Sequence, residues 1–146
     1  MVLFRSLEDQ ELVELLTCCV TKKYPAKENI FSEGDPASKF YMIKDGEVRI
    51  SKMIPGVGEE ALAVLKAGDV FGEMALIDEH TRSAFAIAHS HCTLMEIAIK
   101  DMQEILKTNQ AMASKILMEF CKVLAARLRN TNDKFYGLFA MSAFFK

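Results

Sequence analysis

The spacing of hydrophobic and polar residues changes twice along the chain, and these changes divide it into three sections. In the first section, apolar residues recur three or four positions apart, at Leu12, Leu15, Leu16 and Cys19, as on one face of an amphipathic helix. Ser6 and Asp9 have the spacing of a capping pair at the start of such a helix. We therefore expect a short N-terminal helix within residues 1–19.

In the second section, residues 20–98, apolar residues come in short runs of strand-forming types. Six runs stand out: Asn29–Phe31, Lys39–Ile43, Glu47–Ile50, Ala61–Leu65, Ala84–Ile87 and Thr93–Ile97. Glycines at positions 34, 46, 58 and 68 separate them at intervals of 12, 12 and 10 residues. This rhythm is typical of antiparallel strands in a β-roll or jelly-roll. Asp45-Gly46 carries the clearest hairpin signal.

The third section, residues 99–135, returns to helical spacing. It predicts a helix over residues 101–106 and a long one from about Asn109 to Phe135. The apolar surface of the long helix is broad, and it includes Ile116, Leu117, Phe120, Cys121, Val123, Leu124 and Leu128. We expect one face to lie on the roll and the other to form a two-fold homodimer.

An apolar tail, residues 136–146, follows the long helix. Five of the thirteen aromatic residues lie at or beyond position 135, namely Phe135, Tyr136, Phe139, Phe144 and Phe145. We favour a tail that folds back on the roll or pairs within the dimer, since clustered aromatics are usually buried. A docking site for an effector protein or a membrane surface is the alternative. The whole chain, residues 1–146, has the length of one domain.

Composition narrows the class of protein. With 51% hydrophobic and 26% charged residues the chain is globular, and a net charge of -2 gives it no basic field for nucleic acid or anionic lipid. The sequence has no apolar stretch long enough to span a membrane and no secretory signal. We therefore expect a cytoplasmic protein.

Cysteines and histidines indicate neither a metal centre nor an enzyme. Four cysteines, at positions 18, 19, 92 and 121, lack the spacing of metal ligands or of a disulfide framework. Only three histidines occur, which disfavours a jelly-roll enzyme with a histidine-bound metal. No cysteine or serine lies in a recognisable nucleophile motif. We expect no catalytic activity, no metal and no cofactor.

The candidate chemistry lies in Phe71-Gly72-Glu73-Met74-Ala75-Leu76, followed by Arg82-Ser83-Ala84. A glycine at a strand end opens a single helical turn, whose free N–H groups would face an anion. Arg82 adds a permanent charge with a donor geometry that fits phosphate. Because a carboxylate repels phosphate, Glu73 is suited to accept hydrogen bonds from ligand hydroxyls, such as those of a ribose. The alternative is a plain salt bridge between Glu73 and Arg82.

With their flanks, Phe71–Leu76 and Thr81–Ala84 resemble the phosphate-binding cassette of the cyclic nucleotide-binding domain family, here residues 70–84. Upstream, Phe31–Asp35 and Phe40–Val48 resemble the glycine-marked early strands of the same family. The family includes the bacterial catabolite activator, the regulatory subunits of protein kinases and cyclic nucleotide-gated channels. The resemblance covers roughly residues 5–135 and implies a mainly β fold, an antiparallel roll with flanking helices.

The resemblance also implies roles for single residues. Glu73 would bind the ribose 2′-hydroxyl and Arg82 the cyclic phosphate. Backbone groups would complete the cradle at Gly72, Met74, Ala75 and Ser83. Thr81 stands where many members have proline, which should not remove any phosphate donor. A hydroxyl at Ser83 occurs in members that bind either adenine or guanine cyclic nucleotides, so it does not fix the base. Our first choice of ligand is cAMP, and cGMP is the second.

The end of the long helix resembles that of the activator subgroup, which implies a base contact through Thr131, with Asn132 beside it in the predicted site. A fraying, solvated helix end is the alternative. Arg127 and Arg129 are expected on a solvated face. In that subgroup a helix-turn-helix follows, whereas the twelve residues after Lys134 are too few for one. We expect no DNA-binding segment in these 146 residues.

The sequence thus predicts a stand-alone sensor that binds a 3′,5′-cyclic mononucleotide, dimerises through the C-terminal helix and signals to an unknown effector by moving that helix. The alternative from another class is a dimerisation or docking module that keeps the roll without ligand control. Because both Glu73 and Arg82 are present, we favour the sensor.

Overall fold

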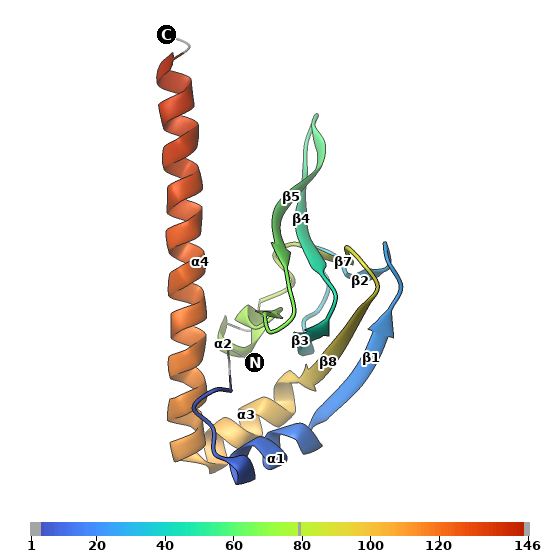
Figure 1. Cartoon of the computed structure of the whole chain (residues 1–146), viewed down its shortest axis with the longest axis vertical. Coiled ribbons are helices and arrows are strands. Elements are labelled where there is room, and N and C mark those ends of the chain that lie inside the picture. Colours follow the sequence, from blue (N-terminus) through green and yellow to red (C-terminus); the bar gives the residue numbers. More distant parts are fainter. Residues whose placement is uncertain (1–3, 79, 145–146) are drawn as a thin grey trace.

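Two antiparallel four-stranded sheets form a roll, and helices cover one end of it (Figure 1). The structure is a computed structural model that describes residues 4–78 and 80–144. The first sheet has the order β1-β8-β3-β6 and consists of β1 (Cys19–Tyr24), β3 (Lys39–Asp45), β6 (Val70–Phe71) and β8 (Cys92–Ala98). The second has the order β2-β7-β4-β5 and consists of β2 (Asn29–Phe31), β4 (Val48–Ile54), β5 (Gly58–Leu65) and β7 (Phe85–Ala88). The predicted fold class is confirmed.

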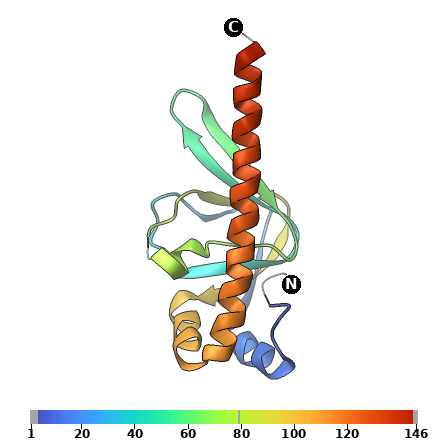
Figure 2. The same cartoon turned by 90° about the vertical axis from the view of Figure 1, so that its left-hand side faces the viewer.

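The helices are α1 (Asp9–Thr17), α2 (Met74–Asp78), α3 (Ile99–Thr108) and α4 (Gln110–Phe144). The first part of α4 lies beside α1 and α3, and the rest runs past the roll and projects beyond it (Figures 1 and 2). The hairpin of β4 and β5 extends in the same direction. Residues of the roll, the hairpin and α4 line one cavity.

β3, an inner strand of the first sheet, is buried on both faces, which explains its uninterrupted apolar run. Phe40 and Met42 pack with the helices, whereas Tyr41 and Ile43 point into the roll and pack with the second sheet. Successive side chains of a strand point to opposite faces. Such a strand needs apolar residues at every position, and the helices are held to the roll by one of its two faces.

The N-terminal helix begins at Asp9, so the predicted capping pair of Ser6 and Asp9 is wrong. Glu8 is the N-cap, and its backbone N–H donates to Glu11 Oε2 at 2.8 Å. Lys115 of α4 also holds Glu11, with a Nζ–Oε2 distance of 2.8 Å. The tertiary contact with α4 therefore fixes the carboxylate that completes the cap.

The hairpin predicted at Asp45-Gly46 is also wrong, because β3 and β4 lie in different sheets. The observed hairpin joins β4 to β5, with a turn in which Val57 N donates to Ile54 O at 3.0 Å. Gly46 has φ +84°, and a Cβ there would clash with the backbone carbonyl of His91. A glycine is required at this crossing between sheets.

Two strands have no counterpart among the predicted runs. In β1 four of six side chains are exposed, because the strand lies at the edge of its sheet and pairs only with β8 among the described strands. β6 has only two residues. Neither strand carries the alternation from which strands are predicted.

The helix expected to end at Phe135 continues to Phe144, so the predicted fold-back of the tail onto the roll is wrong for the described residues. Tyr136 is 77% exposed and Phe144 is 89% exposed. No proline interrupts this stretch, and the helix propagates through it. Phe145 and Lys146 lie outside the described residues. Within the described chain, no helix has the length and apolar character needed to cross a bilayer.

Candidate functional site

The cassette turn begins where β6 ends, at a glycine whose conformation leads the chain into α2. Gly72 has φ +72°, a region that favours glycine. A Cβ at this position would lie 2.6 Å from Arg82 Nη1. Gly72 therefore allows both the turn into α2 and the close approach of the arginine.

Arg82 is buried, with 6% of its surface exposed. Nη1 donates to the carbonyl of Gly72 at 3.1 Å, and Nη2 donates to the carbonyl of Lys39 at 2.5 Å. Nε is buried and has no acceptor among the described residues. Burial lowers the pKa of Arg82, and the nearby groups of Tyr41, Asp35 and Glu73 oppose this. The side chain is thus a buried cation whose Nε donor has no partner among the described residues.

Glu73 is 2% exposed, and its ion-pair partner is Arg127 of α4. Arg127 also donates through Nη2 to the carbonyl of Val70. Burial raises the pKa of Glu73, while the charges of Arg127 and Arg82 act in the opposite direction. The alternative salt bridge between Glu73 and Arg82 does not form in the described chain.

The expectation that Arg127 lies on a solvated face is therefore wrong, whereas Arg129 is exposed as expected. Arg127 is separated from Glu73 by 54 residues. The sequence spacing could have indicated that Arg127 faces the site. Arg127, Thr131 and Lys134 lie three or four positions apart and therefore share one side of a helix. Lys134 donates from this side to the carbonyl of Leu62 in β5 at 2.8 Å.

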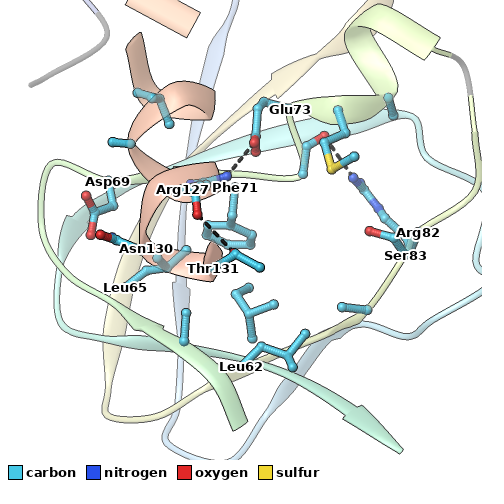
Figure 3. A pocket seen from close by; sticks show the side chains of 18 of the residues that line it. Leu62, Leu65, Asp69, Phe71, Glu73, Arg82, Ser83, Arg127, Asn130 and Thr131 are labelled. Carbon is cyan, nitrogen blue, oxygen red and sulfur yellow. Dashed lines mark hydrogen bonds and ion pairs between the residues drawn. The ribbon is translucent and has the colours of Figure 1, made fainter. Parts of the chain in front are cut away.

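A cavity of about 1730 Å³ lies between the cassette, the β4–β5 hairpin and α4 (Figure 3). Among the predicted site residues, its lining includes Gly72, Glu73, Met74, Ala75, Arg82, Ser83 and Thr131. Leu62 and Leu65 of β5 and Asn130 of α4 add to the wall. The cavity brings buried charges of both signs together with apolar surface, as a site for an anionic, hydroxyl-bearing and partly apolar ligand requires.

Thr131 and Asn132 are on different sides of α4. Thr131 lines the cavity, and its hydroxyl donates to the carbonyl of Arg127 at 2.9 Å. Asn132 lines a shallow groove with Phe135, Tyr136 and Phe139 instead. Because α4 continues to Phe144, the alternative of a fraying helix end at Thr131 is wrong.

A roll with an open cavity that brings a buried arginine and a buried glutamate together with a long helix has the features of a domain that binds an anionic, hydroxyl-bearing ligand. The model of the cyclic nucleotide-binding domain family matches residues 21–109. The chain belongs to this family, as the cassette residues predicted.

The chain is also similar to three proteins with known names. It is 35% identical over 131 residues to the cAMP-activated global transcriptional regulator CRP of Haemophilus influenzae, covering 89% of this chain and 57% of that protein. It is 34% identical over 132 residues to Glutaminase 1 of Bradyrhizobium diazoefficiens, covering 90% of this chain and 21% of that protein. The solved structure of the Thermus thermophilus catabolite activator protein superposes with a TM-score of 0.80 at 30% identity, covering 94% of this chain and 63% of that one. The chain spans less than two thirds of each of these relatives.

Proposed function

We propose that this chain is a regulatory sensor that binds a 3′,5′-cyclic mononucleotide in the cavity between the cassette and α4. One observation carries the proposal: Glu73, the residue expected to bind the ribose, is also the residue that fixes α4 through Arg127. cAMP is the first candidate because a similar regulator is named as cAMP-activated, and cGMP is the second.

The roles follow from the chemistry of each group. Arg82 would turn its unpaired Nε, and the donor now on the Gly72 carbonyl, toward the cyclic phosphate. Glu73 would accept a hydrogen bond from the ribose 2′-hydroxyl. Backbone groups would complete the phosphate cradle at Gly72, Met74, Ala75 and Ser83, and Thr131 would contact the base. Asn132 is left out of this set because it lies outside the cavity.

Signalling would follow from the shared carboxylate. A ligand hydroxyl at Glu73 changes the partners of Arg127 and therefore the free energy with which α4 is held against the cassette. The populations of two α4 positions would shift, and an effector protein would recognise the difference. Hydrogen exchange over residues 127–144 should change when ligand binds, and an unchanged exchange pattern with bound ligand would contradict this mechanism.

We further propose that two copies associate through α4. Residues alternating at intervals of four and three form one exposed stripe: Leu117, Cys121, Leu124, Leu128, Thr131, Phe135 and Leu138. This is the spacing of a coiled-coil seam. The role is regulatory and not catalytic, and a cytoplasmic location suits it. A docking module without ligand control is the competing function, favoured by the exposed aromatic side chains at the end of α4.

Calorimetry with cAMP and cGMP tests the proposal. We expect saturable binding of at least one of them by the parent protein and its loss in Arg82→Ala, with the fold retained as judged by circular dichroism. No heat with either nucleotide at millimolar concentration would reject the sensor and leave the docking module. Binding that Arg82→Ala leaves unchanged would reject the residue assignment alone.

A further inference from the structure

The guanidinium of Arg82 lies over aromatic rings. Arg82 Cζ is 4.1 Å from the centroid of the Phe31 ring and 5.6 Å from that of Tyr41. Both distances are within the range in which a cation is attracted to the face of an aromatic ring. The attraction is stronger where water is excluded, and Arg82 is 6% exposed.

These rings belong to a cluster that bridges the two sheets. Phe31 of β2 lies 5.8 Å from Tyr41 and 5.9 Å from Phe71, and the rings of Tyr41 and Phe71 stack at 4.9 Å with an interplanar angle of 10°. Phe71 directly precedes Gly72, the first residue of the cassette turn. The cluster therefore fixes the place of Arg82 relative to the cassette backbone.

The ring of Phe31 acts on a cation that has no carboxylate of its own. Within the described chain, Arg82 pairs with no Asp or Glu, and its two occupied donors go to the backbone carbonyls of Gly72 and Lys39. A buried cation needs compensation. The ring face of Phe31 supplies part of it without occupying any N–H donor.

We propose that Phe31 is a positioning residue for phosphate recognition: its ring face holds the Arg82 guanidinium in place at the wall of the cavity, from which its N–H donors can be turned to a phosphate. Phe31 touches the arginine, and the arginine touches the phosphate. The inference rests on the proposed function, because it concerns the affinity of the same site. Phe31 is a better test position than Tyr41, because it is half-buried and lines the open cavity, whereas Tyr41 is packed in the core.

Two substitutions separate the effect of the aromatic ring face from the effect of side-chain volume. Phe31→Leu keeps an apolar side chain and removes the π face, while Phe31→Tyr keeps the face. Phe85→Leu removes a half-buried ring of β7 elsewhere in the second sheet and serves as the matched control. We expect Phe31→Leu to weaken cyclic nucleotide binding about tenfold by calorimetry, and Phe31→Tyr and Phe85→Leu to change it less than about threefold.

The ligand-free protein supplies a second readout. A proton above a ring face resonates upfield, so the Nε–Hε signal of Arg82 in a ¹H–¹⁵N spectrum should move downfield in Phe31→Leu and stay in place in Phe85→Leu. The signal is assigned by its absence in Arg82→Lys. A purely structural role of Phe31 would lower the melting temperature and leave this signal unmoved.

Each combination of results either supports the proposed role of Phe31 or overturns it. Weaker binding together with the moved signal supports the proposal. Unchanged binding by Phe31→Leu overturns it while the proposed function stands, and weaker binding with an unmoved signal overturns it in favour of a direct contact between Phe31 and the ligand. Absence of binding by the parent protein overturns both the proposed function and the inference.

Discussion

Glu73 and Arg82 are buried on neighbouring parts of the cassette, yet they do not pair with each other. Arg82 donates to backbone carbonyls, and Glu73 pairs with Arg127 of α4. Removing one partner from a buried ion pair leaves an uncompensated charge, which destabilises far more than the pair itself stabilises. Whether the charge of Glu73 is compensated therefore depends on the position of the long helix.

We predict that Arg127→Met lowers the free energy of unfolding by about 1–2 kcal/mol, a value reduced because Arg127 is partly exposed. Adding Glu73→Gln should recover part of the loss, since the unpaired charge is then absent. Urea unfolding measures both changes. The matched control is Arg129→Met, on the exposed face, which should stay within about 0.5 kcal/mol of the parent protein. Equal losses in the two single variants would contradict the ion pair.

Glu96 is a second buried carboxylate, and its ionised form contributes to the free energy of unfolding. Tyr24 Oη donates to Glu96 Oε1 at 2.5 Å, and Lys39 Nζ lies 2.6 Å from Oε2. Burial raises the pKa of Glu96, but the hydrogen bonds from Lys39 and Tyr24 outweigh it, so the pKa lies below its usual value of 4.5. The folded state then binds fewer protons than the unfolded state at this group.

The resulting stabilisation is present above pH 4.5 and is lost as the pH falls through the lowered pKa of Glu96. We predict that Glu96→Gln lowers the melting temperature and flattens its decline between about pH 5 and about pH 3. Calorimetric melting across this range measures the effect. Glu60→Gln, at an exposed position of β5, should follow the parent curve; a parallel decline in Glu96→Gln would reject the assignment.

At the scale of elements, the path of the chain between the sheets depends on one residue. Gly46 lets β3 leave the first sheet and β4 enter the second, where a side chain would clash with the backbone next to β8. A two-residue turn signal such as Asp45-Gly46 is common to hairpins and to crossings of this kind, because both need a positive φ.

The prediction at this scale compares two glycines. Gly68 also has a positive φ, of +95°, but a Cβ there meets nothing within 4 Å. Gly68→Ala should therefore lower the free energy of unfolding by the backbone term alone, about 1 kcal/mol. Gly46→Ala adds a clash with backbone and should lower it by about 3 kcal/mol or more. Chemical denaturation measures both, and equal losses would mean that the crossing adapts.

At the scale of the whole molecule, α4 has two surfaces in different environments. One lies against the roll, where Met112, Ile116 and Phe120 are buried. The other remains exposed along the stripe that includes Leu124 and Leu128. A second copy would cover this stripe, which meets the edge of the cavity at Thr131.

We predict that Leu128→Glu converts a dimer to a monomer, because it places two like charges at a closely packed seam. Met118→Glu, which adds the same charge at an exposed position off the stripe, should leave the mass unchanged. Light scattering after gel filtration measures the mass. A dimer that survives in Leu128→Glu would place the interface elsewhere. Cys121 gives a further check, since parallel helices in this register would bring two copies close enough for a disulfide on mild oxidation.

Local patterns were sufficient for much of this protein. Glycine spacing predicted the roll, six strand runs matched six strands, and the cassette from Gly72 to Ser83 predicted the family. β1 and β6 were not predicted, because an exposed edge strand and a two-residue strand carry no alternation of apolar and polar residues. The extension of α4 past Phe135 was not predicted, because a segment with apolar residues on every side is usually buried.

The sequence by itself determined the class of fold and the family, and it supplied the residues that we propose to bind an anion, because these depend on period, turn chemistry and short motifs within single elements. Only the tertiary structure decided which side chains meet. Arg127 pairs with Glu73, Lys115 pairs with Glu11, and the guanidinium of Arg82 lies over the ring of Phe31. These contacts join residues from 51 to 104 positions apart. Their free energies depend on burial and geometry, which no local pattern specifies.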